Sequence, residues 1–222
     1  MTTERFDLYT AVHKGIRAQL FEAATWAGRT DFARAGEAAA AAARVARLLA
    51  FLEEHAEKED AVLMPELQRL APEVHADLQG EHARVDGLHR ELHGLLDRLA
   101  TAGEAERVAL GRRLQERLSR LTAEHLRHMD REEGEATRAF HAHRSDEELG
   151  ALHGRILASI PPARMADWSA IMIPALSLPE RAGMLSGMAR KLPAPVFETI
   201  VAPARAALGP AAWAETAAAG GF

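Results

Sequence analysis

The sequence predicts an all-α protein: an up-down-up-down four-helix bundle followed by a tail of short helices. Aromatic residues make up only 5% of the chain, and no alternating β-branched segment indicates a strand. Apolar residues instead recur every three or four positions over long stretches, as in amphipathic helices. Of the 222 residues, 48% are hydrophobic. We therefore expect a sizeable core and no wholesale disorder.

Four long helices are expected in order along the chain. The first covers about residues 4–27 and ends at the Gly28–Asp31 segment, which is rich in helix-breaking residues. The second covers about residues 37–69. The third begins at Pro72, because a proline at the first helical position costs no hydrogen bond, and it ends near Gly103. The fourth covers about residues 104–143, and the short connections favour antiparallel neighbours.

The chain changes in texture at Ser145, after which prolines punctuate short apolar stretches. We therefore expect a bundle domain over residues 1–144 and a short-helix extension over residues 145–222, packed on the bundle or on a partner. The last residues, 217–222, are expected to fray. The apolar tail offers a surface for a protein partner or for a second copy of the chain, and its role is left open.

The composition excludes several classes of protein. The absence of cysteine excludes disulfides, thiolate zinc sites, iron–sulfur clusters and a cysteine nucleophile. A net charge of −5 gives no general attraction to nucleic acid or to an anionic membrane. No apolar run is long enough to span a bilayer, and the N-terminus does not resemble a secretory signal, so a soluble cytoplasmic protein is expected. Because eleven histidines accompany no cysteine, imidazole and carboxylate must hold any metal.

Polar residues interrupt the apolar stripes of all four helices. Each helix places a histidine at a core-facing position, and two of these histidines are followed four residues later by a glutamate on the same face. The residues are His13, His55, Glu59, His82, His128 and Glu132. An ionised carboxylate that faces a bundle core is costly unless it is paired or bound to a cation, and neutral imidazoles need partners as well. One metal site in the bundle interior satisfies all six residues.

The spacing of these residues forms an internal near-repeat. His55 follows His13 by 42 residues, and His128 follows His82 by 46 residues. Each half of the bundle thus supplies one histidine and then a histidine–glutamate pair on the returning helix. A chance scatter of histidines is not expected to repeat in this way.

These motifs resemble the haemerythrin-like (HHE cation-binding) family over about residues 4–143. The segments that carry the resemblance are His13-Lys14-Gly15-Ile16-Arg17, His55 to Pro65, Glu81-His82 and His128-Met129-Asp130-Arg131-Glu132-Glu133. The tail is similar to that of bacterial haemerythrin-domain proteins of comparable length. The resemblance implies a non-haem di-iron centre in which the four histidines are terminal ligands and Glu59 and Glu132 bridge the two iron ions. Nitrogen and carboxylate donors without sulfur suit iron or manganese and also hold zinc.

The sequence departs from the oxygen-carrying members in two places. Those members have a histidine pair one turn apart on the third helix, whereas Asp86 follows His82 here. On the fourth helix, His125 and Asp130 compete with His128 and Glu132. We favour the second pair because residues four apart share a helix face, whereas residues five apart are separated by about 140°. Whether Asp86 or His125 also coordinates is left open.

Three functions remain as hypotheses. The first is a di-iron protein that binds or senses oxygen, nitric oxide, peroxide or iron supply. The second is an oxidase- or peroxidase-type di-iron enzyme, which would turn over with a reductant. The third is a metal-free helical interaction module.

Two further features have a structural and a functional interpretation. Tyr9 lies one turn before His13, and we expect a core tyrosine, with a hydrogen bond to a bound oxygen species as the alternative. His89 and His93 have the spacing of a metal pair, but they lie about two turns beyond His82. We do not expect either of them to join the central site.

Overall fold

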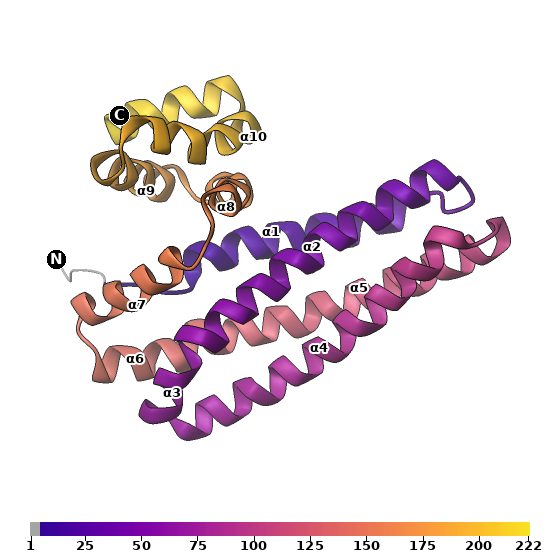
Figure 1. Cartoon of the computed structure of the whole chain (residues 1–222), viewed down its shortest axis with the longest axis horizontal. Helices are drawn as coiled ribbons and strands as arrows, with labels where there is room; N and C mark the ends of the chain where they lie inside the picture. Colours follow the sequence, from indigo (N-terminus) through magenta and orange to yellow (C-terminus); the bar gives the residue numbers. More distant parts are fainter. Residues whose placement is uncertain (1–4) are drawn as a thin grey trace. The chain divides into compact units, whose positions relative to one another are not determined.

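The computed structural model describes residues 5–222, which form helices and no strand (Figure 1). None of the helices in this part of the chain is long and apolar enough to cross a membrane. The elements are α1 (Thr10–Arg29), α2 (Ala35–Val62), α3 (Met64–Leu70), α4 (Pro72–Thr101), α5 (Glu104–Arg131), the π-helix η1 (Glu132–Ala136), α6 (Thr137–His143), α7 (Asp146–Ala158), α8 (Pro162–Ala175), α9 (Leu178–Lys191) and α10 (Ala194–Gly220). Residues 1–4, with the expected start of the first helix and of the bundle domain, lie outside the described residues.

The chain divides into two compact units. The first contains the residues up to Tyr9 and Gln19–His153, and the second contains Thr10–Ala18 and Gly154–Phe222. In the first unit, α2, α4 and α5 are long helices that pack against one another, and the short α3 packs on α4 and α6. Leucines that recur every three or four residues supply its core, among them Leu49, Leu92 and Leu114, each fully buried.

The first expected helix begins later than its apolar pattern suggested. α1 starts at Thr10, because the Asp7 carboxylate accepts a hydrogen bond from the backbone N–H of Tyr9 at 2.8 Å and holds the chain in a turn. The second expected helix is divided into α2 and α3 around Leu63. Pro65 lies in the first turn of α3, where its missing N–H leaves no hydrogen bond unmade.

The first unit extends beyond residue 144, where the sequence placed the boundary. Arg5 Nε donates to Asp146 Oδ1 at 2.6 Å, and Arg5 Nη2 donates to the carbonyl of Arg144 at 2.7 Å. Leu149 is fully buried, and the ring of Phe6 lies 5.7 Å from that of His153. These contacts attach the first part of α7, up to His153, to the first unit.

The second unit has a core of its own. α8 and α9 pack on α10 around an apolar cluster that contains Ile173, Leu185, Phe197, Ile200, Val201 and Ala204. The first turns of α1 belong to this unit: Lys14 forms an ion pair with Glu180. A Cβ on Gly15 would lie only 3.0 Å from the Cα of Met172. The close approach therefore needs glycine at position 15.

The C-terminus is ordered by contacts, so the expected fraying of residues 217–222 is wrong. α10 continues to Gly220, and Gly221 closes it in the left-handed conformation with φ of 67°. The ring of Phe222 lies 5.8 Å from Phe197 and 5.9 Å from Trp213. These aromatic contacts compensate for the entropy lost in ordering the chain end.

Gly111 tests the packing of the first unit. A Cβ at this position would lie 2.2 Å from Cδ2 and 2.3 Å from Cγ of the Phe32 ring. We expect Gly111→Ala to lower the free energy of unfolding by about 1–3 kcal/mol, because the ring must be displaced. The control is Gly94→Ala in α4, where nothing lies within 4 Å and helix propensity should raise stability by about 0.5–1 kcal/mol. Urea denaturation of both variants measures the difference, and an unchanged Gly111→Ala midpoint would contradict this packing.

Candidate metal centre

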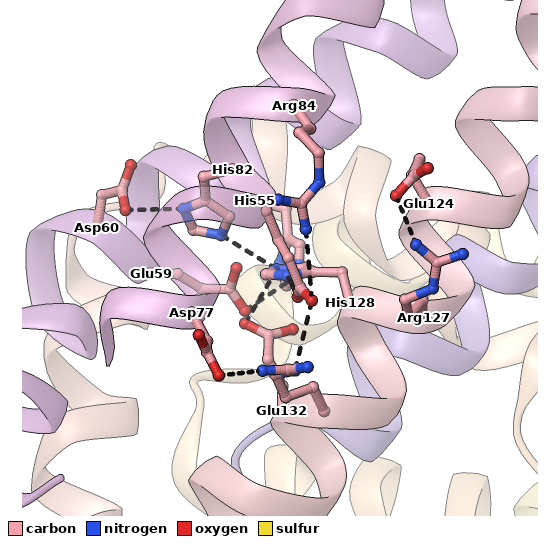
Figure 2. Close-up of polar contacts among 12 residues, drawn as sticks. His55, Glu59, Asp60, Asp77, His82, Arg84, Glu124, Arg127, His128 and Glu132 are labelled. Carbon is pink, nitrogen blue, oxygen red and sulfur yellow. Dashed lines mark hydrogen bonds and ion pairs between the residues drawn. The ribbon is translucent and has the colours of Figure 1, made fainter. Parts of the chain in front are cut away.

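Five of the six residues singled out by the sequence gather in the interior of the first unit. α2 supplies His55 and Glu59, α4 supplies His82, α5 supplies His128, and Glu132 opens η1. Figure 2 shows these side chains pointing toward a common centre from the surrounding helices. Glu59 is 3% exposed and Glu132 is 1% exposed. Two carboxylates are thus held where an ionised group is stable only beside positive charge or strong donors.

Four of these residues form a tight group of possible ligands. Nε2 of His82 lies 3.0 Å from Nε2 of His128, and the same His128 atom lies 3.3 Å from Oε1 of Glu132. Donor atoms from Glu59, His82, His128 and Glu132 all lie within 4.8 Å of one another. Ligands of one metal ion at bonds of about 2.1 Å are about 3–4 Å apart, so these donor spacings fit a cation.

A second group shares both glutamates. Nε2 of His55 lies 3.1 Å from Oε1 of Glu59. Donor atoms of His55, Glu59 and Glu132 also lie within 4.8 Å of one another. Glu59 and Glu132 therefore belong to both groups of possible ligands. The sixth residue, His13, lies in the Thr10–Ala18 stretch of α1 that clusters with the second unit, and its side chain is fully buried.

Two carboxylates outside the predicted set orient the histidines. Asp60 Oδ1 lies 3.0 Å from Nδ1 of His82, and Glu81 Oε2 lies 3.1 Å from Nδ1 of His128. Each carboxylate accepts the N–H of one ring and leaves Nε2 as the atom that faces the donor group. Such carboxylate–histidine pairs fix the tautomer of a metal ligand and raise its basicity.

The Glu81 carboxylate is itself held in place by arginines. Arg131 Nε lies 3.3 Å from Glu81 Oε1, Arg84 Nη2 lies 3.7 Å from the same atom, and Arg131 also pairs with Asp77 at 2.5 Å. Burial acts to raise the pKa of Glu81, but the hydrogen bond and charge of His128 and the two arginines outweigh it and lower the pKa. Glu81 therefore stays ionised.

The π-helix η1 begins at one of the candidate ligands. The backbone N–H of Thr137 bonds back to the carbonyl of Glu132, five residues earlier, and the Thr137 hydroxyl donates to the same carbonyl at 2.9 Å. Glu132 is buried beside His128, whereas Asp130, the alternative considered in the sequence, is exposed. π-segments are rare and occur frequently at functional sites.

The charges of Glu59 and Glu132 affect the phenol of Tyr9. Its side chain is 2% exposed. Burial, followed by the charges of Glu132, Glu59 and Asp7, raises the pKa of the Tyr9 phenol well above its ordinary value. The phenol therefore keeps its proton and can act as a hydrogen-bond donor. The contacts thus fit both interpretations of Tyr9, a core residue and a polar group beside the donor set.

A pocket between α2, α4 and α5 opens onto the donor group. It is lined by Leu52, His55, Ala56, Glu59, Asp60, His82, Val85, Asp86, His125 and His128. Asp86 and His125, whose coordination the sequence left open, thus border the same space, but neither belongs to the two groups of converging donors. His125 is buried and its ring stacks on that of His89, with centroids 5.8 Å apart.

One of three comparisons with known proteins identifies a family. Residues 5–140 match the family described as Hemerythrin HHE cation binding domain. No curated protein and no solved structure matches the chain significantly. The matched range contains all six candidate residues and ends within α6.

The carboxylate behind His128 provides one test of the centre. Replacing Glu81 with alanine removes the acceptor of the His128 Nδ1–H, so we expect the affinity for a divalent metal to fall about 10–100-fold. The matched control is Glu124→Ala on the neighbouring α5, because Glu124 pairs only with Arg127 in the contacts shown in Figure 2, at 3.2 Å. Titration with Co²⁺ measures the affinities. Equal affinities for both variants would remove Glu81 from the centre.

The protonation of His128 gives a pH-dependent prediction for the metal-free protein. Burial lowers the pKa of His128, but the charge of Glu132 and hydrogen bonds with Glu132 and Glu81 outweigh it and raise the pKa to about 10. In the unfolded chain the value is about 6.5. The stability from charged His128 is therefore complete below about pH 6.5 and is lost as the pH rises toward about 10.

Urea denaturation in the presence of a chelator measures this dependence across that pH range. The His128→Ala variant should show a flatter profile than the parent chain, because it lacks the shifted group. A parent profile that stays level or rises between about pH 6.5 and 10 would contradict the protonated interior.

Proposed function

The chain belongs to the Hemerythrin HHE cation-binding domain family, and on that premise we propose that it is a non-haem di-iron protein that binds or senses oxygen, nitric oxide, peroxide or iron. The proposed scaffold is an up-down-up-down four-helix bundle. The proposed ligands are His13, His55, Glu59, His82, His128 and Glu132.

One observation carries the proposal: two overlapping groups of donors share the same two buried carboxylates. A carboxylate that belongs to two donor groups could bridge two ions. Two ionised glutamates inside an apolar bundle also supply the negative charge that offsets two divalent cations. The nitrogen and oxygen donors suit iron or manganese, and the chain contains no cysteine that would favour softer metals.

His13 completes the proposed set on the basis of the sequence repeat. α1 is one continuous helix from Thr10 to Arg29, and its later part, from Gln19 on, belongs to the first unit. The pairing of His13 with the His55–Glu59 motif repeats the pairing of His82 with the His128–Glu132 motif. This symmetry supports one terminal histidine from α1 and one from α4.

The residues around the donors have separate tasks. Bound iron would supply the coordination positions and electrons that small oxygen or nitrogen species need. Asp60 and Glu81 hold the rings of His82 and His128 with Nε2 directed inward. The pocket that Val85, Asp86 and His125 border leads to the donors and is the proposed entry for a small ligand. The Tyr9 phenol, which keeps its proton, is a proposed donor to that ligand.

Metal stoichiometry tests the proposal. After anaerobic ferrous loading and desalting, we expect about two irons per chain for the parent protein, as the shared carboxylates require. Glu132→Ala and His55→Ala should lose stoichiometric iron, because each removes a donor from a group that has few others. His143→Ala, an exposed histidine at the end of α6, serves as the control and should bind iron like the parent. Unchanged iron in both site variants would overturn the assignment.

Oxygen consumption then separates a binding protein from an enzyme. A carrier or sensor binds oxygen without net consumption, whereas an oxidase or peroxidase consumes oxygen or peroxide continuously in the presence of a reductant. The pocket beside the donors is compatible with both, so the rate with and without reductant decides between them. A chain that binds no metal under any condition would favour the interaction-module hypothesis.

A further inference from the structure

A second set of metal-binding side chains lies outside the central group. His89 and His93 are one turn apart on α4, and both face Glu53 of α2. Oε1 of Glu53 lies 2.7 Å from Nε2 of His93 and 3.8 Å from Nδ1 of His89. His89 follows His82 by seven residues, which is about 10 Å along a helix, so these three residues are separate from the central donors.

Glu53 lies within reach of both histidines. Nitrogen and oxygen ligands at bonds of 2.0–2.1 Å in a tetrahedral site are about 3.4 Å apart. The two separations measured from Glu53 Oε1, 2.7 and 3.8 Å, lie on either side of that value. Glu53, His89 and His93 are not among the groups whose donor atoms all lie within 4.8 Å of one another, so Glu53 and His93 must turn before all three can reach one ion. The side chains of Glu53 and His93 are 44% and 47% exposed, so both have room to adjust. His89 is 4% exposed and is the fixed member of the set.

The burial of His89 determines its protonation. Its Nε2 atom is buried without a hydrogen-bond partner, and so is Nε2 of the stacked His125 ring. Burial lowers the pKa of His89, which keeps the imidazole neutral and a lone pair available. Nδ1 is the atom that faces Glu53, and a metal ion bound there would leave the His89 proton on Nε2.

We propose that Glu53, His89 and His93 form a second, mononuclear site for a borderline divalent transition-metal ion such as Zn²⁺ or Co²⁺. Two imidazoles and one carboxylate favour such ions over Mg²⁺ or Ca²⁺, which prefer all-oxygen sets. Three protein ligands leave a fourth position to water, as in open zinc sites. The ion would also link α2 to α4, which pack together in the first unit.

Zinc binding to the full-length, tag-free chain tests this site. Equilibrium dialysis against micromolar Zn²⁺ should give one equivalent fewer for Glu53→Ala and for His93→Ala than for the parent chain. The His143→Ala control, which also removes an exposed histidine, should retain the parent value. Loss of the same equivalent in the control, or its retention in His93→Ala, would overturn the proposal.

A variant that lacks the proposed di-iron ligands distinguishes this site from the central one. The His55→Ala/Glu132→Ala double variant removes the proposed di-iron ligands, and it should still bind one equivalent of Zn²⁺ that addition of His93→Ala abolishes. Because this readout does not depend on iron, failure of the di-iron assignment and failure of the second site give different results. Far-UV circular dichroism confirms that each variant is helical, and absence of the equivalent from the folded double variant would overturn the second site.

Discussion

The burial of two carboxylates constrains the rest of the first unit. Glu59 and Glu132 lie in a leucine-rich interior, where ionised groups need strong compensation. Three imidazoles lie beside them, and Glu81, the carboxylate behind His128, is held by Arg84 and Arg131. The first unit is thus polar at its surface, apolar in its leucine-rich interior and polar again at the donor group. The close packing of the leucines holds the helices, and therefore the donor side chains, in fixed positions.

The sequence predicted the parts of the structure that depend on local patterning. The long helices follow from the spacing of apolar residues, and the association of His55 with Glu59 and of His128 with Glu132 follows from a separation of four residues on one helix. The roles of Asp60 and Glu81 could not be predicted in the same way. Their partners are 22 and 47 residues away in the chain. Each acid is also next to a candidate ligand in the sequence, and at such a position an acidic residue has the same pattern as one on a solvent-exposed helix face.

Other differences arise where tertiary contacts override a local signal. The first part of α7, up to His153, joins the first unit through Arg5 and Leu149, although the sequence placed it in the extension. The first turns of α1 cluster with the second unit through Gly15 and Lys14, and nothing in their periodicity distinguishes them from the rest of that helix. In both cases the contacts join residues more than 130 positions apart in the chain. The three- to four-residue spacing of apolar residues carries no information about such contacts.

The π-helix has a consequence for how such a helix can change in evolution. In a regular α-helix each residue advances by about 100°, so the extra residue within one turn at Glu132–Ala136 shifts everything that follows by one step in phase. His128, before it, points toward the donor group, whereas the residues after it belong to α6, which packs on α3 and contains the buried Phe140. The buried face of α5 and the buried face of α6 therefore point in different directions. The one-residue insertion of the π-helix lets one continuous run of helix present two separate packing faces.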